Sequence, residues 1–450
     1  MTHSAKNPDK LASLTQRRQL LVQRAGGHPI VVSAGVPPAR NYPANTHEFR
    51  ASSHFLYLTG LPLVGAKLLL LPGEGQAGRA ELYVPPPAAD DALWHGEIPS
   101  FGELQQLAGV DAVLPLPELG ARLAALSPGA HLPLPAEPSA RDEQLAQAMI
   151  ELRLRHDEAA VHQMRRAVAV TVQAHQAGLR ATRPGVRIAA VRAAMEQPIL
   201  AADFTTAYAS IVTTHGEILH THDRSGVCQA GELLLADVGA ESDSGWASDV
   251  TRTWPVSGTF SGSQRAIYDI VLSAQIAAIG AVRPGVRYRD VHLTASRVIC
   301  AGLVEEGLLS GQVDGLVERG AHALFFPHGV GHLLGLDVHD MEDLGDRAGY
   351  APGRSRSPQF GLCYLRLDRD LQAGTAVTIE PGIYFVPQIL HNAALTRPLG
   401  SDFHPGRLGH FADVRGIRIE DDVLVTAAGC EVLTQAIPKT ASAVEAAMRE

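Results

Sequence analysis

The sequence LLLADVGAESDSGWASDVTRTWPV occupies residues 233–256. Residues 233–238 form an apolar run of strand type with Asp237 near its end, and the β-rich run 246–256 carries Asp249. A turn rich in serine and glycine joins the two runs, so a hairpin would bring both carboxylates to the same end of a sheet. Two aspartates alone are weak support for a site, because acids beside a turn are usually exposed to solvent.

Histidines and glycines alternate in a second segment, PHGVGHLLGLDVHD, residues 327–340. His328 and His332 lie four residues apart, and His339 follows seven residues after His332. Glycines beside histidines allow the backbone to come close to a ligand or a metal ion. Each histidine taken singly is more simply explained as a structural loop residue.

Two further acids lie in strand-like surroundings. Glu380 ends an apolar run in TIEPGIY, residues 378–384, and Glu420 lies among branched residues in GIRIEDDVLVT, residues 416–426. Arg418 and Glu420 fall on one strand face by the period of two. A carboxylate inside such a strand is costly to bury unless it is paired or bound to a metal ion.

Taken together, four carboxylates and one imidazole form an oxygen-rich set of ligands: Asp237, Asp249, His332, Glu380 and Glu420. Such a set suits two divalent ions, namely Mn, Co or Zn in a carboxylate setting. Two ions about 3.5–4 Å apart would need bridging carboxylates and would leave room for a bridging water or hydroxide.

In this order and in these four strings, the residues resemble the proline-specific branch of the pita-bread metallopeptidases, the Xaa-Pro aminopeptidases and Xaa-Pro dipeptidases (prolidases). The strings FLYLTG, residues 55–60, and WHG, residues 94–96, are similar to the non-catalytic domain of that branch. The spacing from Asp237 to Asp249 is one residue longer than the aminopeptidase pattern, which a longer turn absorbs. The resemblance implies an α+β pita-bread catalytic domain with a curved antiparallel sheet, preceded by a smaller α/β N-terminal domain.

The composition also divides the chain into two parts. A length of 450 residues suits two domains, and a proline-rich stretch, residues 110–138, precedes a charged, helix-favouring segment, residues 139–183. We therefore expect an N-terminal domain over residues 1–150 and a catalytic domain over residues 151–450. Strand-like and helix-like runs are expected at 29–33, 67–71, 80–84, 187–202, 263–282, 288–306, 376–379 and 417–425.

The resemblance implies roles for the candidate ligands. Asp237 would chelate one ion, Asp249 and Glu420 would bridge both, and His332 and Glu380 would complete the other site. Glu380 would also take a proton from the attacking water and help to deliver one to the leaving nitrogen.

The same resemblance implies roles for residues around the metal centre. His220 would face the substrate, His339 would bond the substrate carbonyl, and His328 would line the pocket for proline. Arg418 would hold the carboxylate ligands in place. Tyr384 matches the family spacing after Glu380, although a packed strand aromatic explains it equally well. His222 has no counterpart in this pattern, and we expect it at the surface or the pocket rim.

Arg366 bears on the choice between two substrate classes. It lies fourteen residues before Glu380, and prolidases carry an arginine at about this spacing that grips the free carboxylate of a C-terminal proline. The long segment 385–414 is also more like prolidases. We therefore expect Xaa-Pro dipeptides as substrates, with aminopeptidase action on longer peptides as the alternative. Taken alone, Arg366 is equally explained as a surface arginine.

Other classes fit less well. A methionine aminopeptidase would lack the N-terminal domain and Arg366, and a metal-free C–N hydrolase or a non-catalytic homologue would lack some of the five ligands. The formal net charge of −9 argues against nucleic acid as a partner. The chain has no run of apolar residues long enough for a membrane span or a signal peptide, and its four cysteines are widely spaced. We expect a cytoplasmic enzyme that binds manganese and, by the resemblance, forms a homodimer.

Overall fold

The computed structural model describes residues 8–73, 78–88, 90–221 and 223–449. By its internal contacts the chain divides into two compact units, Met1–Val161 and His162–Glu450. The domain boundary near residue 150 stays a prediction, and that position falls inside α6 (Ala140–Arg153) of the first unit.

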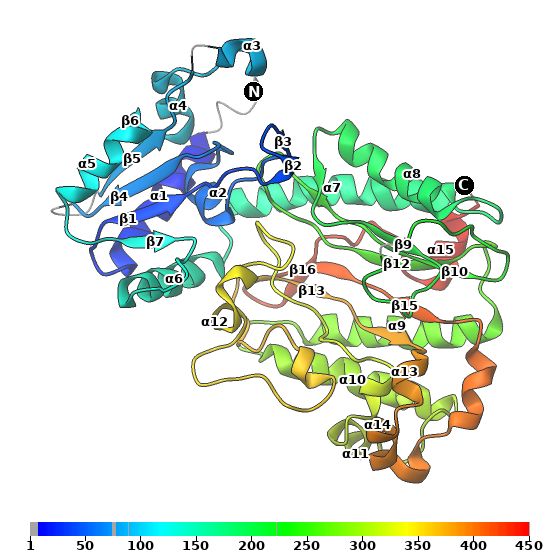
Figure 1. Ribbon diagram of the computed structural model, residues 1–450. Coiled ribbons are helices and arrows are strands. Elements are labelled where there is room, and N and C mark those ends of the chain that lie inside the picture. The colour runs from blue at the N-terminus through cyan, green and yellow to red at the C-terminus, as the bar shows by residue number, and fades with distance from the viewer. Residues whose placement is uncertain (1–7, 74–77, 89, 222, 450) are drawn as a thin grey trace. The chain divides into compact units, whose positions relative to one another are not determined.

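A mixed sheet with the strand order β6-β5-β4-β1-β7 forms the centre of the first unit (Figure 1). β4 pairs antiparallel with β1 and β5, whereas β6 and β7 pair in parallel with β5 and β1. The runs expected at 29–33, 67–71 and 80–84 are confirmed as β1, β4 and β5. The strands of this sheet are β1 (Ile30–Ser33), β4 (Lys67–Leu71), β5 (Arg79–Val84), β6 (Ala112–Pro115) and β7 (Ala130–Leu132).

Helices and a short hairpin complete the first unit. The core against one face of the sheet includes Val31, Leu69, Tyr83 and Leu119. These elements are α1 (Pro8–Arg24), α2 (Ser53–Thr59), α3 (Asp91–His95), α4 (Phe101–Ala108), α5 (Leu119–Ala124), β2 (Ala39–Tyr42) and β3 (Asn45–Thr46). The α/β character expected for this part of the chain is confirmed.

The helix-favouring segment 139–183 forms two helices rather than one. α6 ends at Arg153, and α7 (Glu158–Ala181) begins after a short break. The Asp157 side chain accepts a hydrogen bond of 2.8 Å from the Ala160 N–H, so it caps α7. The same carboxylate forms an ion pair of 2.7 Å with Arg17. These two contacts favour the break, which helix propensity alone does not predict.

All strand pairs of the second unit are antiparallel within the described residues. They form the groups β12-β10-β9, β11-β8, β13-β16-β17 and β14-β15. The strands are β8 (Thr205–Thr206), β9 (Ile211–Thr213), β10 (Leu233–Asp237), β11 (Ala240–Glu241), β12 (Thr251–Pro255), β13 (Ala376–Ile379), β14 (Gly382–Tyr384), β15 (Gly416–Arg418), β16 (Asp421–Val425) and β17 (Cys430–Val432).

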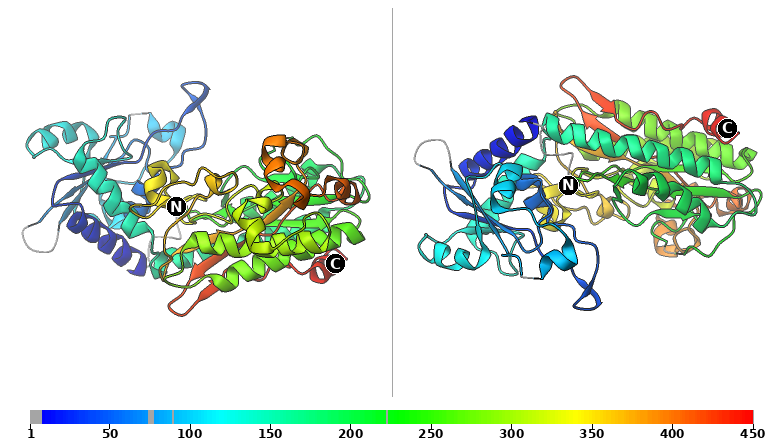
Figure 2. Two further views of the ribbon diagram at one scale, coloured as in Figure 1. Left: turned by 90° about the horizontal axis from the view of Figure 1, so that it is seen from below. Right: turned by 90° about the horizontal axis from the view of Figure 1, so that it is seen from above.

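Long helices lie on both sides of these strands. α7 and α8 (Ile188–Ala201) lie on one side, and α9 (Gly262–Ala281) and α10 (Tyr288–Glu305) lie on the other (Figure 1). The two turned views show each pair from its own side (Figure 2). This is the α+β pita-bread arrangement that the motifs predict. The shorter helices of the unit are α11 (Val313–Glu318), α12 (Asp346–Gly349), α13 (Pro387–Leu390), α14 (Ala393–Thr396) and α15 (Ala441–Ala447).

The strand expected over residues 417–425 is wrong as a single element. β15 ends at Arg418 and β16 begins at Asp421, because β15 pairs with β14 whereas β16 pairs with β13. Glu420 lies at this change of partner, where its backbone N–H donates to the Thr251 carbonyl at 3.0 Å. A search of the described helices finds none long and apolar enough to cross a membrane.

Candidate active site

The hairpin expected around Asp237 and Asp249 is present. β10 and β12 pair antiparallel with Asp237 opposite Thr251, and Asp249 lies two residues before β12 begins. Asp237 accepts hydrogen bonds from the Tyr208 hydroxyl at 2.5 Å and from Arg418 Nη2 at 2.6 Å. One end of the hairpin therefore carries both acids.

The backbone around His332 is fixed by close packing against β13. The His332 N–H donates to Thr378 Oγ1 at 3.2 Å. Gly331 has a φ of +154°, and a Cβ there would collide with the Thr378 carbonyl. Glycine is therefore required at this position so that the segment can lie against the strand that delivers Glu380.

The His332 ring faces two carboxylates. Its Nδ1 lies 3.0 Å from the Leu333 carbonyl, so Nδ1 is the donor and a neutral ring exposes the Nε2 lone pair. Nε2 lies 3.3 Å from Asp249 Oδ2 and 3.8 Å from Glu380 Oε1. Burial lowers the pKa of His332, but Asp249 and Glu380 raise it by more, so a positive charge between the ring and these carboxylates is favoured. A proton can take this place when no metal ion is bound, and a divalent ion would displace it, so these residues fit a metal ion.

The ligand atoms of three of the five expected metal ligands lie within 4.8 Å of one another: Asp249, His332 and Glu420. Glu380 adjoins the group through His332, and Asp237 is linked to it through Arg418. No other group of this kind is found in the described part of the chain.

The Thr251 hydroxyl joins Glu420 to Arg418. It donates to Glu420 Oε2 at 2.8 Å and accepts from Arg418 Nε at 2.9 Å. Arg418 and Glu420 therefore lie on the same face, as their spacing predicts, and a single buried hydroxyl orients both side chains.

Asp422 supports the loop that carries Asp249. Its carboxylate accepts a hydrogen bond from Ser248 Oγ at 2.8 Å and another from the Asp249 N–H at 3.1 Å. Asp421, between the two acids, turns to the other side and pairs with buried Arg252 at 2.7 Å. Glu420 and Asp422 therefore face the candidate site, whereas Asp421 faces the core.

Burial and mutual repulsion govern the charge of the cluster. Burial, with a further contribution from Asp249, raises the pKa of Glu420 well above its usual value. The pKa of Glu380 is also raised by burial, although His332 and Arg418 oppose the change. Protons therefore neutralise part of this cluster when no metal ion is bound, and divalent cations would displace those protons.

His328, Tyr384 and Arg418 form a chain of hydrogen bonds. His328 Nδ1 lies 2.7 Å from the Gly329 carbonyl, so it donates there, and Nε2 accepts from the Tyr384 hydroxyl at 2.8 Å. Arg418 Nη1 donates to the same hydroxyl at 3.2 Å. Burial lowers the pKa of His328 to about 3, so this ring is neutral.

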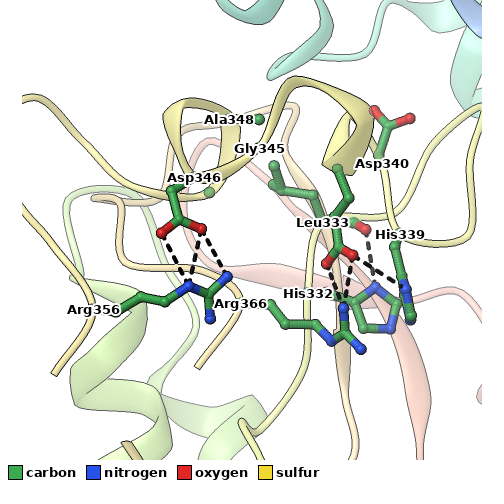
Figure 3. Close-up of a pocket in the computed structure, with 11 residues that line it drawn as sticks. His332, Leu333, His339, Asp340, Gly345, Asp346, Ala348, Arg356 and Arg366 are labelled. Atoms are coloured by element: carbon green, nitrogen blue, oxygen red, sulfur yellow. Dashed lines mark hydrogen bonds and ion pairs between the residues drawn. The ribbon is translucent and has the colours of Figure 1, made fainter. Parts of the chain in front are cut away.

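A pocket of about 80 Å³ begins at His332 and extends past His339 to Arg366 (Figure 3). The His332 and His339 rings meet edge to face with centroids 4.3 Å apart. Beyond them, Glu342 contacts both His339 and Arg366. The pocket therefore extends from the cluster of expected metal ligands to Arg366, the arginine that bears on the choice of substrate class.

His220 is exposed and lies near enough to His328 to contribute to the lowered pKa of that ring. His222 lies outside the described residues. All four cysteines are free thiols.

Several residues around the site are not predicted from the sequence. Tyr208 and Thr251 belong to no ligand-like pattern, and only the fold brings them to Asp237 and Glu420. Glu342 lies three residues after His339, but the intervening Met341 has a φ of +62°, so the pair does not lie in a regular helical turn and helical spacing does not identify it.

Comparison with known proteins places these motifs in a family. Residues 161–427 match the profile of metallopeptidase family M24, and residues 14–132 match that of the aminopeptidase P N-terminal domain. The chain is similar to the Xaa-Pro dipeptidase of Homo sapiens, with 30% identity over 97% of this chain and 93% of the relative. It is also similar to Xaa-Pro aminopeptidase 1 of Streptomyces coelicolor, with 32% identity over 96% and 86%.

A solved structure agrees with these sequence comparisons. The aminopeptidase PepP of Pseudomonas aeruginosa superimposes with a TM-score of 0.81 and 30% identity, covering 99% of both chains. The fold is therefore shared over nearly the whole length.

Proposed function

Because the chain belongs to metallopeptidase family M24, in the branch of the Xaa-Pro dipeptidases and Xaa-Pro aminopeptidases, we propose that it hydrolyses the peptide bond before proline. The observation that carries this proposal is the arrangement around His332, whose Nε2 atom faces the carboxylates of Asp249 and Glu380. A cation is the simplest partner for such a group of acceptors.

We propose that Asp237, Asp249, His332, Glu380 and Glu420 hold two divalent ions, with manganese as the first candidate and zinc or cobalt as alternatives. The carboxylate-rich donor set supports hard or borderline ions. When bound, such ions would supply Lewis acidity and make an attacking water more acidic.

The chain's own residues would position the substrate and move protons. Glu380 lies at the end of β13 beside His332, where its carboxylate would accept a proton and return one to the leaving nitrogen. His339, which lines the pocket, would donate a hydrogen bond to the substrate carbonyl, and His220 would act from the exposed side. The neutral His328 ring and Tyr384 would line the site for proline.

The bond before proline has no amide N–H, so a peptidase cannot grip it by that hydrogen bond. Recognition must therefore come from the ends of the peptide and from the proline ring. We propose that Arg366 binds the free carboxylate of an Xaa-Pro dipeptide and that the enzyme is therefore a dipeptidase. The alternative is an aminopeptidase acting on longer peptides, supported by the aminopeptidase PepP structure and by the existing ion pair of Arg366 with Glu342.

Hydrolysis of Ala-Pro and Ala-Pro-Ala, each with added manganese, tests this proposal beside an Arg366→Ala variant. We expect Ala-Pro to be preferred and the variant to lose that preference, because the guanidinium no longer pairs with the carboxylate. Cleavage of the tripeptide at an equal or higher rate would favour the aminopeptidase instead. The control is a metal-stripped sample, which should lose activity and recover it when manganese is returned.

A further inference from the structure

Glu342 contacts two other residues that line the pocket beside the cluster of expected metal ligands. Arg366 Nη1 donates to its two carboxylate oxygens at 2.8 and 2.7 Å, and His339 Nδ1 lies 3.5 Å from Oε2. Figure 3 shows Arg366 and His339, the two residues that contact this carboxylate, near each other in the pocket. A continuous path of contacts therefore runs from Arg366 to His339 and on to His332.

The ion pair uses only one nitrogen of Arg366. Within the described chain, both hydrogen bonds of its guanidinium come from Nη1, and no described residue accepts from Nε or Nη2. These two nitrogens form a planar edge that matches the two oxygens of a carboxylate. About a third of the Arg366 side chain is exposed, and the residue lines the pocket.

A second arginine of the same pocket provides a contrast. Arg356 gives Nε and Nη2 to Asp346, and its Nη1 donates to the Leu365 carbonyl at 3.0 Å. All three nitrogens of Arg356 are therefore used within the protein, and no edge is left for a substrate. The two ion pairs differ in geometry, although both consist of an arginine and a nearby acid.

The backbone places Glu342 with some strain. Met341, immediately before it, is fully buried and has a φ of +62°, an uncommon conformation for a residue with a side chain. The turn that follows directs Glu342 back toward His339 and Arg366. Although burial opposes ionisation, hydrogen bonds from His339 and Arg366 lower the pKa of Glu342 to about 2, so it is an anion at neutral pH.

We propose that Glu342 is a specificity-determining positioning residue, which holds Arg366 by Nη1 so that Nε and Nη2 face the carboxylate of an Xaa-Pro dipeptide. This inference rests on the proposed dipeptidase function. A free arginine side chain loses considerable rotamer entropy when it binds a ligand. Because the ion pair with Glu342 already restricts the rotamers of Arg366, less entropy is lost when the substrate binds.

The test compares Ala-Pro with Ala-Pro amide, which differ only in the charge of the C-terminal group. For Glu342→Ala we expect the KM for Ala-Pro to rise roughly tenfold relative to the KM for the amide. Loss of the longer contact with His339 should affect kcat for both substrates alike, so it cancels in the ratio of their kcat/KM values. Glu342→Gln keeps an acceptor for Nη1 and should retain most of the wild-type ratio.

Two further variants complete the design. Asp346→Ala breaks the Arg356 ion pair in the same pocket and should leave the ratio unchanged. In an Arg366→Ala background, Glu342→Ala should cause no further change in the ratio, because its effect acts through Arg366.

A Glu342→Ala enzyme with the wild-type ratio, or with an equal loss on both substrates, would overturn the positioning role while leaving the proposed function intact. If the wild type cuts neither substrate, the proposed function fails, and the role of Glu342 fails with it.

Discussion

Thr251 supplies one hydroxyl group to two side chains of the candidate site. The hydroxyl donates to Glu420 and accepts from Arg418, and the residue is fully buried. Neighbouring Thr253, two residues along β12, bonds only the backbone of Arg418, at 3.1 and 3.2 Å. Thr251 therefore orients a proposed metal ligand, whereas Thr253 supports only the strand.

We expect Thr251→Val to weaken manganese binding by about tenfold or more, since loss of a residue that orients a metal ligand typically has an effect of this size. The change should also destabilise the protein by about 1–3 kcal/mol, because Glu420 and Arg418 each lose a buried partner. Manganese titration of activity and chemical denaturation of the metal-free protein measure the two effects.

Thr253→Val is the matched control. It should also lower the stability of the protein, but manganese affinity should stay close to that of the wild type. A similar loss of affinity in both variants would mean that Thr251 acts only through the strand.

At the scale of elements, the sequence predicts those helices and strands whose positions are determined by hydrophobic periodicity and by turn residues. The β10–β12 hairpin, the strand before Glu380 and helices α8, α9 and α10 appear where the patterns place them. The break at Glu420 is not predicted, because it depends on a change of pairing partner rather than on local composition. Tyr208 and Glu342 are missed for a similar reason, since each meets its partner through folding of distant or irregular segments.

The packing of a short 3₁₀ helix, residues 321–324, against α10 buries two histidines that the proposed mechanism does not use. His322 is fully buried, and neither ring nitrogen has a hydrogen-bond partner among the described residues. His292 of α10 lies beside it, with ring centroids 5.8 Å apart. Burial lowers the pKa of His322 to about 4.

This lowered pKa predicts a loss of stability in acid. Between pH 6.5 and about 4, the unfolded chain binds a proton at His322 and the folded chain does not, so stability falls as the pH falls. The contribution approaches about 1.4 kcal/mol per pH unit in this window. His322→Leu should flatten the dependence of unfolding free energy on pH, as measured by urea denaturation at several pH values.

Substitution of the exposed His391 serves as the control, and it should leave the slope unchanged. An unchanged slope in His322→Leu would show that the ring does not titrate differently in the folded and unfolded states.

At the scale of the whole molecule, the carboxylate cluster and the apolar core of the first unit belong to different compact units. The tryptophans allow the second unit to be observed, because Trp246 and Trp254 are buried there whereas Trp94 of the first unit is 70% exposed. The shift of tryptophan fluorescence on unfolding therefore reports mainly on the unit with the candidate metal centre.

We expect manganese to raise the melting temperature seen by tryptophan fluorescence, because an ion that binds only the folded site stabilises it. At a concentration one hundred times the Kd, the gain is about 2.7 kcal/mol, which corresponds to several degrees for a unit of this size. Asp249→Asn removes a charge from the cluster and should reduce or abolish the shift, while relieving repulsion in the metal-free protein. An equal shift in Asp249→Asn and wild type would place manganese elsewhere, and no shift in the wild type would contradict the proposed metal centre.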